Sequence, residues 1–291
     1  MTAPDWAARR YWMGSCLFLL GTWIASGSCL PAWSAEPPRP LKVLLITGGC
    51  CHDYKTQKDL LKDGLEARAH VVVDQVHSDD ASTAPKLAIF GNPDYARGYD
   101  VVIHDECAAK ISDPAIIAGV LAPHRAGIPG VNLHCAAHCY RIGPPTQPAA
   151  LGSERAMWFE YLGLQSSGHG PKLPIPVETI AAEHPILHGL GWQSWTTGNE
   201  ELYNNIQIYP TATPLQRGSQ VVTRRGTEQR TEAVVTWVND YRGTRVFSTT
   251  LGHYNETVAD DRYLDLVTRG LLWACGKLND EYLKPQSEGG K

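Results

Sequence analysis

Residues 41–52, LKVLLITGGCCH, decide the fold expected for this chain. The run Leu41–Thr47 is aliphatic and has the length of a buried strand, and two glycines end it with backbone freedom for a tight turn. Leucines then recur at helical spacing over residues 55–67. This order of strand, glycine loop and helix predicts the first unit of an α/β sheet.

Alternation of strand and helix continues to residue 133. Further strands are expected at His70–Val76, Tyr99–His104 and Ile128–Leu133, and a helix at Asp113–Arg125. Such alternation predicts a mainly parallel sheet with helices on both faces. In these sheets ligands gather beyond the carboxyl ends of the strands, so functional side chains are expected in the residues that follow each strand.

The chain changes character after Gly143, where prolines punctuate a loop. A short helix is expected at residues 157–162 and a closing amphipathic helix at residues 260–274. Four segments between them are predicted as additional, partly antiparallel strands: Val177–Ile180, Gln220–Thr223, Glu232–Val238 and Thr244–Thr250. The expected fold is an α/β sandwich of three layers.

The first 35 residues have the pattern of a secretory signal peptide. Arg9 and Arg10 precede an apolar stretch, and small residues ending at Ala35 close it before a proline-rich segment. This pattern predicts an exported protein, periplasmic or extracellular, and the two arginines also match a twin-arginine signal loosely. An uncleaved anchor and a lipoprotein site at Cys29 are the alternatives.

Composition describes an acidic globular protein. The 291 residues are 43% apolar and 19% charged with a formal net charge of -4, which fits one domain with a buried core. The acidic balance argues against nucleic-acid binding, which needs a broad basic surface. One domain is expected over residues 36–278, followed by a frayed polar tail at residues 279–291. No membrane span is expected once the signal is removed.

Six cysteines remain beyond the expected signal peptide. They are Cys50, Cys51, Cys107, Cys135, Cys139 and Cys275. In an oxidising compartment exposed thiols tend to pair. Adjacent cysteines rarely bridge each other, so a link from Cys50 or Cys51 to Cys135 or Cys139 is the expected pairing.

Histidines follow three of the predicted strands. His52 comes after the glycine loop, His134 directly after the strand that ends at Leu133, and His253 after the strand Thr244–Thr250. Strands of a parallel sheet end at one edge, so these imidazoles are expected to converge. With the neighbouring cysteines they could ligate a metal or supply a nucleophile. A tight turn around one buried thiol is the alternative for the first segment.

Residues 131–141, VNLHCAAHCYR, have the pattern of a nucleophile elbow with His134 at its apex. The pairs His134/His138 and Cys135/Cys139 are each four residues apart and so share a helix face. Either pair could chelate a metal, and the histidine pair suits zinc best. A buried helix start with one capping histidine is the alternative.

Residues 197–203, TGNEELY, are predicted to form a polar loop. Its two carboxylates, Glu200 and Glu201, could ligate a metal or act as a general base, and a solvated acidic turn is the alternative. His104 is expected behind the site or in the core, and His169 is a candidate for the wall of the cleft.

Taken together, these segments resemble the ThuA-like family, associated with trehalose utilisation, a branch of the class I glutamine amidotransferase-like superfamily. The resemblance covers about residues 41–276. It rests, in chain order, on Ile46–His52, Leu133–Cys135, His184–Ile186, Glu200–Tyr203, Gly252–Glu256 and Leu271–Ala274. It implies a flavodoxin-like, amidotransferase-like three-layer sandwich with a mainly parallel central sheet.

The resemblance also implies a polar, metal-binding pocket made from His52, His134, Glu201 and His253, and a sugar or 3-keto-sugar substrate. The leading hypothesis is an enzyme dependent on a divalent metal, zinc first and manganese, nickel or iron as alternatives. It would hydrolyse, isomerise or eliminate from a disaccharide or 3-keto-sugar. The three histidines are assigned as ligands, and Glu201 as fourth ligand or general base.

His138 and Tyr203 are assigned to proton transfer or to contacts with sugar hydroxyls. Two other functions stay open. The first is a thiol hydrolase in which Cys135 acts with His253 and Glu256, on the pattern of amidotransferases, whose elbow apex is a cysteine; it requires a depressed thiol pKa. The second is a non-catalytic carbohydrate-binding protein.

Overall fold

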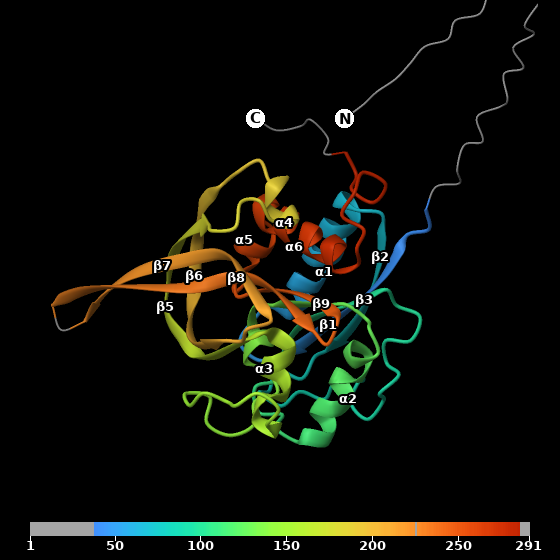
Figure 1. The fold of residues 1–291 in the computed structure, drawn as a ribbon, viewed down its shortest axis with the longest axis horizontal. Coiled ribbons are helices and arrows are strands. Elements are labelled where there is room, and N and C mark those ends of the chain that lie inside the picture. The colour runs from blue at the N-terminus through green and yellow to red at the C-terminus, as the bar shows by residue number, and fades with distance from the viewer. Residues whose placement is uncertain (1–37, 225, 286–291) are drawn as a thin grey trace, which may run out of the picture. The chain divides into compact units, whose positions relative to one another are not determined.

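One sheet of nine strands organises the protein in the computed structural model, which describes residues 38–224 and 226–285 (Figure 1). The signal peptide predicted for residues 1–35 lies outside the described residues. The strands are β1 (Leu41–Gly49), β2 (Val71–Ser78), β3 (Val101–Cys107), β4 (Gly130–Leu133), β5 (Leu164–Thr179), β6 (Ser194–Ile208), β7 (Ala212–Arg224), β8 (Thr227–Tyr241) and β9 (Thr244–Thr249). The helices are α1 (Tyr54–Arg68), α2 (Pro114–Arg125), α3 (Met157–Leu162), α4 (Pro185–His188), α5 (Asn255–Val258) and α6 (Asp261–Ala274), with 3₁₀ turns η1 (His134–His138) and η2 (Glu154–Ala156).

Half of the sheet is parallel, as predicted. Strands β2, β1, β3, β4 and β9 lie side by side in that order and pair in parallel, which is the flavodoxin-like strand order. The expected flavodoxin-like α/β class is therefore confirmed.

Two apolar layers sandwich the parallel strands, because β1 is buried on both faces. Val43 and Leu45 of β1 pack in one core with residues of α1 and α6, while Leu44 and Ile46 pack in another with residues of α2 and α3. Figure 1 shows these two pairs of helices on opposite sides of the sheet. At Gly64, a Cβ atom would lie 2.5 Å from the Leu264 side chain, so glycine permits the close approach of α1 and α6.

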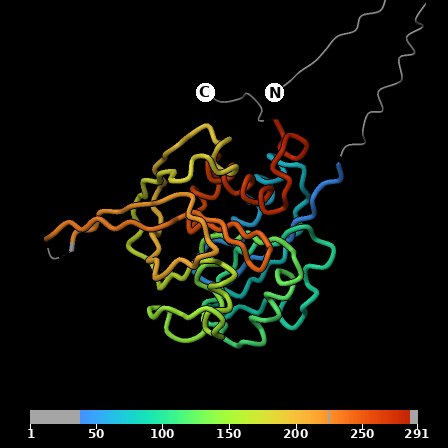
Figure 2. The backbone as a smooth tube through the Cα atoms, in the orientation of Figure 1, coloured from blue at the N-terminus to red at the C-terminus, as the bar shows by residue number. Residues whose placement is uncertain are grey.

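Antiparallel strands extend the sheet beyond β9. They follow in the order β8, β7, β5 and β6, and all four are longer than the expected segments. In Figure 2 the β7–β8 ribbon reaches beyond the other elements. Among the described residues, no helix combines the length and the hydropathy that a membrane crossing requires.

The polar loop predicted at residues 197–203 is wrong, because these residues lie inside β6. Glu201 pairs with Lys172 of β5, and Tyr203 pairs with His169. The polar side chains face a pocket rather than solvent, so they imitate the composition of a loop. Glu200 and Glu201 are both buried.

Residues 279–285 pack against the domain, so the fraying expected from residue 279 does not hold for them. Leu283 forms a β-bridge with Ala69, and the backbone N–H of Lys284 donates to the carbonyl of Arg68. Tyr282 is 5% exposed and belongs to the core beside α1 and α6. One buried aromatic side chain anchors a segment that is otherwise polar.

We predict that Tyr282→Ala lowers the free energy of unfolding by about 2 to 4 kcal/mol, because a buried aromatic ring leaves the core. Urea denaturation measures the change. The exposed neighbour Glu281→Ala is the control and should stay within about 0.5 kcal/mol of the parent protein. Equal stability of both variants would show that the segment does not contribute to the core.

Candidate active site

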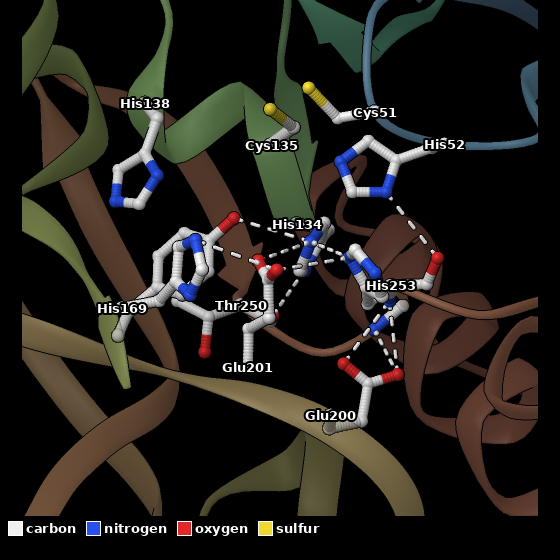
Figure 3. Close-up of polar contacts among 12 residues, drawn as sticks. Cys51, His52, His134, Cys135, His138, His169, Glu200, Glu201, Thr250 and His253 are labelled. Atoms are coloured by element: carbon white, nitrogen blue, oxygen red, sulfur yellow. Dashed lines mark hydrogen bonds and ion pairs between the residues drawn. The ribbon is translucent and has the colours of Figure 1, made fainter. Parts of the chain in front are cut away.

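Three histidines from three loops meet at the carboxyl ends of the parallel strands (Figure 3). His52 follows β1, His134 follows β4 and His253 follows β9. The ring centroids of His52 and His134 lie 4.7 Å apart, those of His52 and His253 4.6 Å, and those of His134 and His253 5.2 Å. One nitrogen from each ring lies within 4.8 Å of the other two. The parallel topology thus produces the convergence expected from strand-end histidines.

Hydrogen bonds to backbone carbonyls orient two of the rings. Nδ1 of His134 donates to the carbonyl of Thr250 at 2.6 Å, which leaves Nε2 facing the pocket. Nδ1 of His52 lies 3.4 Å from the carbonyl of His253. His134 has a φ of 41°, which turns its side chain into the pocket at the end of β4 as the elbow pattern predicts.

Glu200 and Glu201 divide two tasks, because successive side chains of a strand point to opposite sides. The carboxylate of Glu200 accepts the backbone N–H of His253 at 3.0 and 3.1 Å and so fixes that loop. The carboxylate of Glu201 faces the imidazoles, 3.5 Å from Nε2 of His134 and 3.5 Å from Nδ1 of His253.

Burial and mutual repulsion keep two of the imidazoles neutral. Burial, followed by the charges of the other histidines, lowers the pKa of His52 to about 2. Burial and the charge of His134 lower the pKa of His253 to about 4. Neutral imidazole is the form that binds a metal.

His134 and Glu201 favour a positive charge between them. Burial opposes protonation of His134, but its hydrogen bond to Glu201 and the charges of Glu200 and Glu201 outweigh burial and raise its pKa. Burial likewise opposes ionisation of Glu201, yet the hydrogen bond and charge of His134 bring its pKa to about 2. A cation bound to Nε2 of His134 would occupy the place of this proton.

The donor spacing fits a four-coordinate ion. Nε2 of His134 lies 3.3 Å from Nδ1 of His253, and both lie 3.5 Å from Glu201 oxygens. A tetrahedron with metal–ligand bonds of about 2.0–2.1 Å has edges of about 3.3–3.4 Å. Three imidazoles and one carboxylate are also the ligand types that zinc takes in proteins.

Comparisons with known proteins agree with this fold. The ThuA family, described as trehalose utilisation, matches residues 42–274. The chain belongs to the ThuA family. No curated protein sequence matches it.

Solved structures share the ThuA fold of this chain. A putative ThuA-like protein from Parabacteroides merdae aligns with a TM-score of 0.60 at 20% identity over 82% of this chain and 91% of its own. One from Bacteroides uniformis aligns with a TM-score of 0.54 at 17% identity over 84% and 95%. A putative GMP synthase protein from Thermoplasma acidophilum aligns with a TM-score of 0.48 at 12% identity over 82% and 96%.

His138 and Tyr203 lie side by side in this ThuA-family pocket. Their rings stack with centroids 3.9 Å apart and 5° between their planes. The Tyr203 hydroxyl lies 3.3 Å from Nε2 of His134, and Nε2 of His138 lies 2.8 Å from Oγ of Ser166. Burial raises the pKa of Tyr203 well above its ordinary value and lowers that of His138 well below. Both side chains are therefore neutral at pH 7.

Two cationic residues that sequence analysis did not single out line the same cavity of about 340 Å³: Arg141 and Lys172. Nζ of Lys172 lies 3.7 Å from Glu201, its partner across the β5–β6 pairing. Knowing that register would have identified Lys172, but nothing in its local sequence does. His169 lines the cavity as expected, 3.5 Å from Glu201. His104 is fully buried in the core, away from the cavity.

The expected pairing of Cys50 or Cys51 with Cys135 or Cys139 is wrong, because a disulfide joins Cys50 to Cys51. The Cys135 thiol donates to Sγ of Cys107. That hydrogen bond, together with burial, raises the pKa of Cys135 well above its ordinary value. A thiol hydrolase requires the opposite shift, so the site argues against Cys135 as a nucleophile activated by His253.

In the presence of a chelator, we predict that stability falls as pH drops from about 6.5 to about 4. Because the folded-state pKa values of His52 and His253 are lowered, the unfolded chain binds more protons than the folded chain in this range. His52→Gln should make the slope shallower by up to about 1.4 kcal/mol per pH unit, and the exposed His188→Gln should not. Urea denaturation across pH measures the slope, and an unchanged slope in His52→Gln would contradict this electrostatic account.

Proposed function

We propose that this ThuA-family protein is a divalent-metal-dependent enzyme of carbohydrate catabolism that acts on a disaccharide or 3-keto-sugar. One observation carries the proposal: three imidazole nitrogens and the Glu201 carboxylate converge with the spacing of a tetrahedral site. Zinc suits this donor set best, and manganese, nickel and iron are alternatives.

His52, His134 and His253 would hold the ion, with Glu201 as the fourth ligand. When bound, such an ion supplies Lewis acidity toward a carbonyl or hydroxyl oxygen. Of the two roles considered for Glu201, ligand is the better supported. A carboxylate with a pKa of about 2 accepts a proton poorly at neutral pH.

Proton donation is assigned to Tyr203. Its hydroxyl keeps its proton at neutral pH and points at the imidazole of His134. It can therefore donate to a substrate oxygen that gains negative charge beside the metal ligands. The stacked ring of His138 holds the Tyr203 ring in place, and its own low pKa makes it a weak base.

A carbohydrate substrate is supported by the family description, trehalose utilisation. The cavity of about 340 Å³ has the size of small-molecule sites, and a second cavity of about 490 Å³ shares His52 and His253 with it. Arg141, His169 and Lys172 offer hydrogen-bond donors to sugar hydroxyls along the first cavity.

We also propose export, with residues 1–35 as a signal peptide and residues 36–278 as the ThuA domain. The disulfide between Cys50 and Cys51 supports an oxidising compartment outside the cytoplasm, periplasmic or extracellular.

We predict about one equivalent of divalent metal in protein purified without a chelator or a histidine tag. The double variant His134→Ala/His253→Ala should lose it, because two of the four ligands are removed, and the exposed His188→Ala should keep it. Elemental analysis measures the content. No metal in the parent protein after dialysis against zinc, manganese, nickel and iron, or equal content in the double variant, would sink the metal proposal.

On a panel of 3-keto-disaccharides, we predict that Tyr203→Phe lowers kcat by about 10² without changing metal content, because it removes only the donated proton. Tyr209→Phe is the matched control, since the Tyr209 hydroxyl bonds to the carbonyl of Ala149 elsewhere in the fold. Unchanged turnover in Tyr203→Phe would remove this role. Saturable sugar binding without turnover or metal dependence would instead indicate a carbohydrate-binding protein.

A further inference from the structure

Four sulfur atoms lie in a row beside the histidine pocket. A disulfide joins Cys51 to Cys50, Sγ of Cys50 lies 3.6 Å from Sγ of Cys107, and Sγ of Cys107 lies 2.6 Å from Sγ of Cys135. Cys51 is exposed, Cys50 is half-buried, and the last two are buried. The row therefore runs from the surface into the core.

Strand pairing builds this row. In the parallel pairing of β1 with β3, Gly49 stands opposite Cys107. A Cβ atom at Gly49 would lie 2.3 Å from the carbonyl oxygen of Cys107, so only glycine allows the two backbones to come this close. Residue 50 consequently emerges directly beside Cys107, and the turn after β4 brings Cys135 to the other side of Cys107.

The arrangement holds one disulfide and one dithiol in contact. The two buried sulfurs are closer than the van der Waals separation of two sulfur atoms. The thiol of Cys135 donates to Cys107, and this hydrogen bond lowers the pKa of Cys107 against the opposing effect of burial. Thiolate is the attacking species in thiol–disulfide exchange, and Sγ of Cys50 is in contact with that nucleophile.

The other two free cysteines of the described chain do not take part. Sγ of Cys139 accepts the backbone N–H of Ala108 at 2.9 Å and donates to the carbonyl of Glu106 at 3.0 Å. Cys275 follows the end of α6.

We propose that Cys50, Cys51, Cys107 and Cys135 form a thiol–disulfide exchange relay that carries two electrons from the buried pair to the exposed pair, and from there to a small-molecule disulfide. The relay contains none of the metal ligands, so it stands independently of the proposed enzyme activity.

Exchange proceeds in two steps. In the first, the Cys107 thiolate attacks Sγ of Cys50; the Cys107–Cys50 bond forms, the Cys50–Cys51 bond breaks, and Cys51 leaves as a thiolate that takes up a proton. In the second, Cys135 loses its proton and attacks Sγ of Cys107; the Cys107–Cys135 bond forms, and Cys50 leaves as a thiolate that is protonated. Cys107 and Cys135 are oxidised, and Cys50 and Cys51 are reduced.

The exposed dithiol then passes its electrons outward. It reduces a small-molecule disulfide, R–S–S–R, to two R–SH molecules, and the Cys50–Cys51 disulfide is restored. The protein ends with two disulfides in place of one, and every electron and proton that leaves it appears in the two thiols released.

Alkylation of the native protein tests the relay without any added reductant, because iodoacetamide captures the exposed thiols and draws the exchange forward. Peptide mass spectrometry after acid quenching should find Cys50 and Cys51 alkylated and a Cys107–Cys135 disulfide. Cys135→Ser should stop after the first step, with Cys51 alkylated and a Cys50–Cys107 disulfide. Cys107→Ser should keep the Cys50–Cys51 disulfide, and Cys275→Ser should behave as the parent protein.

Parent protein that retains an unlabelled Cys50–Cys51 disulfide after native alkylation, with Cys107 and Cys135 labelled only on denaturation, overturns the proposal, whether or not the variants fold. A second measurement tests the outward step. Oxidised glutathione should convert the parent protein to the form with two disulfides and release two equivalents of reduced glutathione, while no release overturns that step.

Discussion

The parallel pairing of β4 with β9 is the constraint on which the pocket depends. It sets Leu133 opposite Thr249, so the next residues of both strands emerge side by side. The Nδ1 hydrogen bond from His134 to the carbonyl of Thr250 then locks the imidazole across this seam. His253 follows three residues later, and without this register the two imidazoles would not face each other.

Electrostatics complete what the strands begin. Three imidazoles this close disfavour one another's protonation, and the pKa values of His52 and His253 fall accordingly. Glu201 brings a carboxylate among them from the antiparallel half of the sheet, while Glu200 ties the His253 loop to the same strand. The pocket thus joins two halves of the sheet and favours a cation where His134 and Glu201 meet.

Sequence alone predicted the parts governed by local pattern. The aliphatic run Leu41–Thr47 predicted a strand buried on both faces, and histidines after strands predicted convergence at one edge. It could not predict contacts that depend on long-range register. Glu201 and Lys172 face each other only because β5 and β6 pair antiparallel, and the polar stretch 197–203 imitated a loop because it lines a pocket.

The cysteines show the same limit, since the spacing of Cys50 and Cys51 argued against the bond that joins them. Sequence placed Cys135 near the elbow, but only the β1–β3 register places Cys107 between it and Cys50. The sulfur row and the imidazole pocket are thus separate products of one set of strand ends.

Anomalous diffraction at the zinc absorption edge, from crystals of the processed protein grown with zinc, tests the central claim most directly. The account predicts one peak at about 2.0–2.1 Å from a nitrogen of each of His52, His134 and His253 and from an oxygen of Glu201. A peak at the cysteine sulfurs instead, or none in the pocket, would contradict it.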